Sequence, residues 1–132
     1  MEIIQIKKIE FNQDERGWSI QPITDGEIRT CKISDVHMVS MKPGTIRGNH
    51  YHVHKTEHIL IIGGPCRVVV VDNNTKKREE RIIEENTKKL LIFPPNITHA
   101  IENIGNELSY LVCYSKVKEY SDKPDVVRNK II

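Results

Sequence analysis

Apolar and polar residues alternate along most of this chain, in short runs that are rich in β-branched side chains. Alternation with a period of two is typical of strands that bury one face, because successive side chains of a strand point to opposite sides. No run has the sustained apolar spacing of an amphipathic helix, and the only helical feature we expect is a short turn within residues 122–132. The pattern therefore predicts an all-β fold.

Turn-forming residues separate the alternating runs. Glycine, proline, asparagine and aspartate cluster at residues 14–17, 63–65 and 94–96, among other places, and these residue types favour tight turns. Short strands divided in this way indicate a sandwich or a small barrel. The strands that we expect are residues 3–9, 18–22, 36–41, 50–52, 57–62, 66–72, 80–84, 90–93, 99–103 and 108–116.

The length of 132 residues suits one domain, with its core at about residues 9–116 and a C-terminal tail at 117–132. The 20 basic and 18 acidic residues are interspersed, which argues against a surface for nucleic acid or membranes. The longest apolar runs, such as residues 59–62, are far shorter than the roughly 20 residues of a membrane helix. The N-terminal residues alternate like a strand and do not resemble a signal peptide.

The cysteines suggest a reducing compartment. Cys31, Cys66 and Cys113 are an odd number, widely spaced and without a CxxC pair, so we expect no disulfide framework. A cytoplasmic protein is the expectation that follows. Cys66 and Cys113 lie in strand-like runs, where we expect them to be buried as small hydrophobic residues.

Four histidines and a glutamate stand together in the segment GTIRGNHYHVHKTEH, residues 44–58. His50 and His52 are two residues apart, so a strand projects both from one face. Glu57 begins the next alternating run, and His58 must then point to the face opposite Glu57. With His99 on a later strand, three imidazoles and one carboxylate offer a mixed nitrogen and oxygen site. Such a site suits Zn, Fe, Mn, Ni or Co and leaves coordination positions open to substrate.

The other histidines have simpler expected roles. His54 is expected in a solvated loop, and His58 outward or at an interface. His37 is expected to be a packed strand residue.

Residues 44–64 read Gly-x5-His-x-His-x4-Glu-x6-Gly, which resembles the first motif of the cupin superfamily. The second cupin motif is met at Pro94, His99 and Asn103, whereas Lys88 and Asn96 stand where the family has glycine. The resemblance, to the RmlC-like cupins, implies a single-domain double-stranded β-helix, a jelly-roll-like barrel with a metal at its centre. It also implies the metal ligands, which are His50, His52, Glu57 and His99.

Two further segments narrow the resemblance. FNQDERGWSIQPI and KPGTIRGNHYH resemble segments of nucleotide-sugar 3,5-epimerases. RGNHYH is also similar to sugar ketoisomerases and to the C-terminal cupin domain of bifunctional capsular-polysaccharide nucleotide-sugar enzymes. The resemblance implies an isomerase or epimerase of polysaccharide or deoxysugar biosynthesis, which removes a proton next to the ketone of a nucleotide sugar.

The resemblance also implies roles for individual residues. His50 would act as the base, a tyrosine on another strand as the acid, and Arg47 would contact the substrate. Tyr110 and Tyr114 share one face of the last strand, which would place them in the pocket if that face points inward. Asn49 could contact the substrate or orient His50 through a hydrogen bond.

Two mechanisms remain open, because a histidine that binds metal is not free to act as a base. If His50 is a ligand, a metal-bound hydroxide, Tyr110 or Tyr114 must take the proton instead. The epimerases have glutamine where this chain has His52, and the carboxylate that orients their base cannot be placed in this sequence.

Two other classes of function also remain open. The same ligands would serve a metal-dependent dioxygenase or another small-molecule cupin enzyme, and a non-catalytic sugar-binding or effector-binding cupin is the third class. We expect a homodimer, since a strand at residues 3–9 could pair across a two-fold axis.

Overall fold

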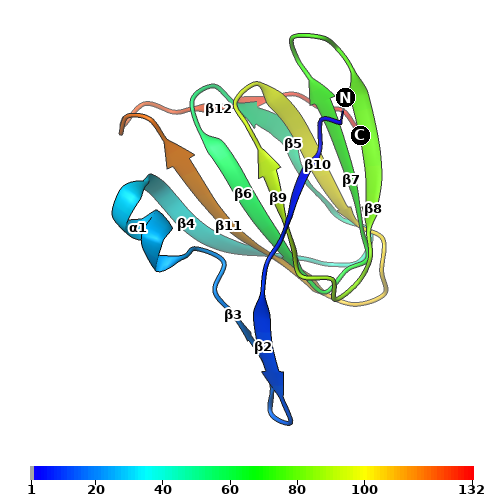
Figure 1. Ribbon diagram of the computed structural model, residues 1–132. Coiled ribbons are helices and arrows are strands. Elements are labelled where there is room, and N and C mark those ends of the chain that lie inside the picture. The colour runs from blue at the N-terminus through cyan, green and yellow to red at the C-terminus, as the bar shows by residue number, and fades with distance from the viewer. Residues whose placement is uncertain (1) are drawn as a thin grey trace.

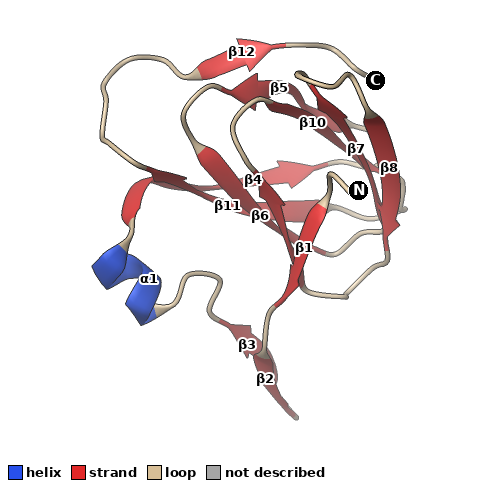
Figure 2. Cartoon of the chain, turned by 45° about the horizontal axis from the view of Figure 1, so that its top comes forward, coloured by secondary structure: helices blue, strands red, loops and turns tan. Residues whose placement is uncertain are grey.

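The computed structural model describes residues 2–132, in which two five-stranded antiparallel sheets face each other (Figures 1 and 2). Sheet I has the strand order β1-β9-β6-β11-β4, and sheet II has the order β12-β5-β10-β7-β8. A separate hairpin of β2 and β3 extends away from the two sheets (Figure 1). This arrangement confirms the predicted all-β fold of the jelly-roll type.

The elements have the following bounds. They are β1 (Gln5–Lys8), β2 (Phe11–Asp14), β3 (Gly17–Ile20), α1 (Asp25–Thr30), β4 (Lys32–Met41), β5 (Ile46–His52), β6 (Thr56–Ile62), β7 (Cys66–Asp72), β8 (Arg78–Ile83), β9 (Lys89–Phe93), β10 (Ile97–Asn103), β11 (Ser109–Val117) and β12 (Val126–Arg128).

The main core lies between the two sheets. Alternate residues of facing strands fill it, and the best buried include Val68 and Val70 of β7, Leu91 of β9 and Ile101 of β10. Cys66 and Cys113 belong to the same cluster, which confirms that both are buried. The core fills part of the space between the sheets, and the remainder forms the cavity described below.

A second apolar layer covers the outer face of sheet I. Leu60, Leu90 and Tyr114 are buried there, beneath residues such as Ile9 and Ile23 of the segment that precedes β4. Sheet I is therefore buried on both faces over part of its width. This is why β6 is apolar at successive positions from Ile59 to Ile62 instead of alternating with polar residues.

The segment over sheet I contains the single described helix, α1. Thr24 caps it by accepting a hydrogen bond from the backbone N–H of Glu27, and the Glu27 carboxylate accepts one from the Thr24 N–H. This reciprocal pair is a capping box, which stabilises the first turn of a short helix. Among residues 2–132, no helix is long and apolar enough to cross a membrane.

The structure departs from the sequence-based expectation at both ends of the chain. The helical turn expected within residues 122–132 is wrong, because Val126–Arg128 form β12, which pairs with β5. β2 and α1 were not expected either. Each is a short element of at most six residues, too short for a period of alternation to identify. The ten expected strands are all present, although β5 starts at residue 46, four positions before its expected start.

Candidate active site

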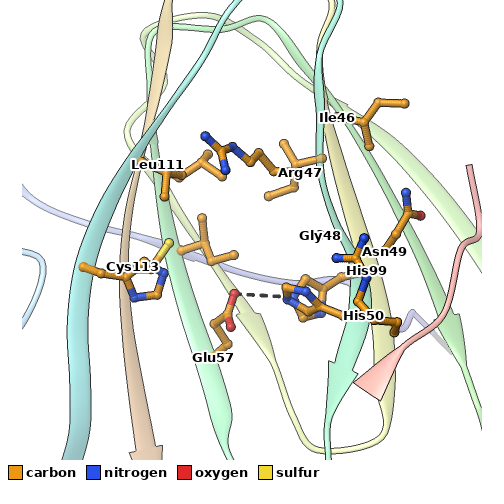
Figure 3. A pocket seen from close by; sticks show the side chains of 14 residues that line it. Ile46, Arg47, Gly48, Asn49, His50, Glu57, His99, Leu111 and Cys113 are labelled. Atoms are coloured by element: carbon orange, nitrogen blue, oxygen red, sulfur yellow. Dashed lines mark ion pairs between the residues drawn. The ribbon is translucent and has the colours of Figure 1, made fainter. Parts of the chain in front are cut away.

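A cavity of about 420 Å³ opens between the two sheets (Figure 3). Sheet II lines it with Arg47, His50 and Arg128 among others, and sheet I with Glu57 and Cys113. Its size is within the range of pockets that bind small molecules. The predicted site residues that line it are Arg47, Asn49, His50, Glu57 and His99.

Three histidines converge on the buried carboxylate of Glu57. His50 and His99 lie directly opposite each other on β5 and β10, with ring centroids 4.8 Å apart. His52 Nε2 is 2.6 Å from Glu57 Oε2, and His99 Nε2 is 3.4 Å from Glu57 Oε1. One candidate ligand atom from each of His50, His52 and Glu57 lies within 4.8 Å of the others. The four predicted ligands are thus brought together from both sheets.

The free nitrogen atoms of this cluster suit a divalent metal ion. His50 Nε2 and His99 Nε2 are buried and make no hydrogen bond within residues 2–132. His99 Nδ1 donates to the Ile97 carbonyl at 3.1 Å, because a carbonyl can only accept, and Nε2 of the neutral ring therefore carries the lone pair. Unpaired imidazole lone pairs beside a carboxylate form a donor set that fits Zn²⁺ or a similar ion.

Burial and mutual contacts set the charges of the cluster. Burial, together with the nearby His99, lowers the pKa of His50 to about 4. Burial alone would raise the pKa of Glu57, but its contacts with His52 and His99 hold that pKa well below the usual range. Burial opposes protonation of His52, yet the hydrogen bond to Glu57 raises its pKa. Ionised Glu57 and neutral His50 are the forms that bind a metal ion, whereas the proton that Glu57 favours on His52 would be released when a metal binds.

A second carboxylate, Asp125, supports His52 from the side away from the cavity. Its Oδ2 lies 3.3 Å from His52 Nδ1, and the side chain is 7% exposed. The backbone N–H groups of Val53, His54 and Lys55 donate to it at 2.7–3.1 Å, which fixes its position. Sequence reasoning could not place an orienting carboxylate, because Asp125 is 73 residues from His52 and no local pattern joins them.

A β-bulge brings Arg47 onto the same face as His50. In the pairing of β10 with β5, His99 lies opposite His50 but Ala100 lies opposite Gly48, which leaves Asn49 as the extra residue. The bulge reverses the alternation, so Arg47 and His50 both face the cavity although they are three residues apart. Figure 3 shows Arg47 extending from β5 toward Leu111, and its Nη2 donates to the Ser40 carbonyl of β4 at 3.1 Å.

Asn49 also lines the cavity, but its side chain makes its hydrogen bonds elsewhere. Its side-chain oxygen accepts hydrogen bonds from the backbone of Ile131 and Ile132, and its amide nitrogen donates to the Ile132 carbonyl. Its φ of 57° is left-handed, a conformation that asparagine tolerates better than most residues. The side chain therefore fastens the C-terminal tail and does not orient His50.

The expected position of the two tyrosines is also wrong. Leu111 and Cys113 line the cavity from β11, so Tyr110 and Tyr114 point to the other face of sheet I. Tyr114 is buried in the outer apolar layer, where its hydroxyl donates to Glu27 at 3.2 Å. Neither tyrosine is placed to exchange a proton with a molecule in the cavity.

The other three histidines lie outside the cluster around Glu57. His54 is exposed, as expected. His58 faces away from Glu57, on the outer face of sheet I, as expected. It is nevertheless only 5% exposed, because it stacks on Tyr114 in the outer apolar layer and does not reach solvent. His37 is not packed in a strand interior, because its side chain is half exposed and lines the cavity from β4.

Comparison with known families gives one match. The model of the family described as polysaccharide biosynthesis C-terminal domain matches residues 12–127. A search of curated proteins finds no significant match.

Several solved structures are similar in fold. CapF, a capsular polysaccharide assembling protein from Staphylococcus aureus, is 23% identical with a TM-score of 0.67, and the match covers 93% of this chain and 34% of CapF. A 3,4-ketoisomerase from Helicobacter canadensis is 20% identical with a TM-score of 0.71, covering 96% of this chain and 90% of the enzyme.

A third similar structure is RmlC, a dTDP-6-deoxy-D-glucose-3,5-epimerase from Legionella pneumophila in complex with dTDP-4-keto-L-rhamnose. It is 16% identical with a TM-score of 0.74, covering 97% of this chain and 73% of the epimerase. The fold is thus shared with sugar-modifying proteins, and the chain spans about a third of the length of CapF.

The bulge leads to a prediction about Gly48. This glycine has φ +96°, and a Cβ at its position would lie 2.6 Å from the His99 carbonyl oxygen. We expect Gly48→Ala to lower the free energy of unfolding by about 3 kcal/mol, through backbone strain combined with the clash. Gly44→Ala is the matched control, since Gly44 has φ +78° but no atom within 4 Å of the added Cβ. It should cost only about 1 kcal/mol. Equal losses for the two variants in denaturant titrations would contradict this account of the bulge.

Proposed function

The chain belongs to the family of polysaccharide biosynthesis C-terminal domains, and from this premise we propose that it is a metal-dependent isomerase or epimerase of a keto nucleotide sugar. The observation that carries the proposal is the cavity itself. It joins a cluster of three imidazoles and one carboxylate to two arginines, Arg47 and Arg128, in a space between the sheets. The end with the histidines and Glu57 could place a metal ion beside a reacting carbonyl group, and the two arginines could bind an anion.

Arg47 and Arg128 are the proposed contacts for the diphosphate of the substrate. They come from the neighbouring strands β5 and β12, and Arg128 lies opposite His50 in the pairing of these strands. One N–H group of Arg47 donates to the Ser40 carbonyl, which orients the guanidinium across the cavity. The other N–H groups remain available as donors to a ligand. Guanidinium groups match phosphate oxygens in geometry and charge. Binding the diphosphate here would direct the sugar ring toward Glu57.

His50, His52, Glu57 and His99 are the residues that would hold the metal ion. When bound, a divalent ion supplies Lewis acidity that stabilises the negative charge of an enolate. The two unpaired nitrogens, His50 Nε2 and His99 Nε2, support the version of the site in which His50 is a ligand and not the base. Asp125 beside His52 Nδ1 would hold that ring in the orientation and tautomer needed for ligation through Nε2.

Solvent exchange tests this function. We expect the metal-loaded protein to exchange deuterium from D2O into the carbon next to the ketone of at least one member of a panel of dTDP- and UDP-linked 4-keto-6-deoxyhexoses. Loss of the proton signal in NMR spectra measures the rate. Removal of the metal with a chelator should slow exchange at least about 100-fold, and adding the metal back should restore it.

Other outcomes identify other functions. A keto sugar that stabilises the protein against heat but never exchanges would contradict catalysis and favour a binding role. Consumption of O2 in the presence of Fe(II) and a substrate would favour an oxygenase.

The position of Asp125 predicts its effect on metal affinity. Asp125→Asn removes the charge beside His52 Nδ1, and we expect metal affinity to fall about 10–100-fold in a competition titration with a chromophoric chelator. Asp122→Asn changes an exposed aspartate of the same segment and serves as the control, with unchanged affinity expected. If both variants bind metal as the wild type does, Asp125 has no part in the site.

A further inference from the structure

His37 and Asp35 form a carboxylate–imidazole pair on β4, at the wall of the cavity opposite His50. His37 Nδ1 is 3.0 Å from Asp35 Oδ1, and Asp35 Oδ2 accepts a hydrogen bond from Lys55 Nζ at 3.1 Å. An ionised carboxylate can only accept, so Nδ1 is the protonated nitrogen of neutral His37. Nε2 then carries the lone pair, and it makes no hydrogen bond to any residue from 2 to 132.

The strand register fixes where this pair lies relative to Glu57. Asp35, Ser115 and Glu57 stand opposite one another on β4, β11 and β6, so they form one row across the inner face of sheet I. His37, Cys113 and Ile59 form the next row. His37 is thus two strands from Ile59, about 10 Å sideways at ordinary strand spacing.

The cavity occupies the space between His37 and the cluster around Glu57, since both line it. A sugar ring placed there would have the imidazole cluster on one side and the His37 side chain on another.

We propose that His37 is the acid–base catalyst that moves the proton next to the ketone, with Asp35 as its positioning residue. The assignment rests on the proposed function. The lone pair of Nε2 takes the proton from the carbon beside the ketone, and the electrons of the broken C–H bond form the carbon–carbon double bond of an enolate. The negative charge moves to the former carbonyl oxygen. For isomerisation, the hydroxyl proton on the deprotonated carbon passes to the former carbonyl oxygen. The imidazolium then gives its proton to the former carbonyl carbon, which leaves a ketone at the neighbouring position and restores neutral His37.

Asp35 prepares His37 for this role. It fixes the tautomer with Nε2 free, and its negative charge stabilises the imidazolium that forms when the proton is taken. Lys55 holds the other carboxylate oxygen, so Asp35 cannot turn away from the ring without losing that contact.

The other groups of the cavity are less suited to the step. The nitrogens of His50, His52 and His99 belong to the cluster around Glu57.

The thiol of Cys113 and the two tyrosines are also unsuited to the step. Burial, together with the charges of Glu57 and Asp35, raises the pKa of Cys113 to about 12, so its thiol stays protonated at neutral pH. Tyr110 and Tyr114 lie on the outer face of sheet I.

The test compares His37→Gln with His54→Gln, a change of the same type at an exposed loop histidine. The assay is exchange from D2O into a dTDP- or UDP-linked 4-keto-6-deoxyhexose that the wild type exchanges. We expect His37→Gln to exchange at least about 100-fold more slowly. Its metal content should stay within about threefold of the wild type, because His37 is not one of the proposed metal ligands. Its affinity for the same keto sugar should also stay within about threefold, because the proposed diphosphate contacts at Arg47 and Arg128 are unchanged. His54→Gln should match the wild type in all three measurements.

Asp35→Asn tests the positioning role of Asp35 through the tautomer of His37, which can be measured without an activity assay. Nitrogen-15 NMR of the metal-free wild type should show His37 protonated at Nδ1, and the Asp35→Asn spectrum should show loss of this preference. The same variant should exchange more slowly than the wild type while it still binds the keto sugar.

The outcomes separate the two proposals. If the wild type exchanges deuterium and His37→Gln does so equally fast, His37 is not the catalyst, although the proposed function stands. Loss of metal or of sugar binding in His37→Gln would show a structural role and overturn the assignment. If the wild type binds keto sugars but exchanges none, the proposed function fails and the role of His37 fails with it.

Discussion

The carboxylate of Glu57, buried between His52 and His99, is the interaction on which the rest of the site depends. A buried charge without a partner is strongly destabilising, and removing one member of a buried pair typically costs about 3–5 kcal/mol. The fold meets this requirement mainly with His52 of β5, whose Nε2 lies 2.6 Å from Glu57 Oε2. His99 of the neighbouring strand β10 also faces Glu57 on β6, with its Nε2 3.4 Å from Oε1. Asp125 then supports His52 from behind. The two sheets are therefore joined by a charged cluster as well as by apolar packing.

The two sheets contribute different chemistry to one cavity. Sheet II presents the histidines at the end of the β5–β10 pair, and its bulge at Asn49 turns Arg47 onto the same face. Sheet I contributes Glu57 and, two strands away, the His37–Asp35 pair. A substrate held between them would meet groups that bind anions on one side and a group able to take a proton on another. Our proposals assign binding and proton transfer to different residues, so single substitutions can separate them.

Local alternation was enough to predict part of this arrangement. It placed His50 with His52 and put His58 on the face opposite Glu57, because parity along one strand needs no knowledge of its neighbours. It could not tell which face of β11 points inward, since sheet I is covered on both sides and both sets of alternate residues are largely apolar. The tyrosines were misplaced for this reason. The bulge at Asn49 and the contact of Asp125 with His52 depend on pairing between distant segments, which no local pattern reveals.

A crystal structure of the metal-loaded wild type with dTDP-glucose, a nucleotide sugar that has no ketone to react, would test the proposed roles of the cavity and of His37 together. We expect the hexose in the cavity between Glu57 and His37, with the diphosphate at Arg47 and Arg128. A sugar carbon that bears hydrogen should lie about 3.5 Å from His37 Nε2, the separation of groups ready to react. A hexose bound outside this cavity would contradict the proposed binding site. A structure in which all sugar carbons lie far from His37 and other residues hold the metal would contradict the proposed catalytic site.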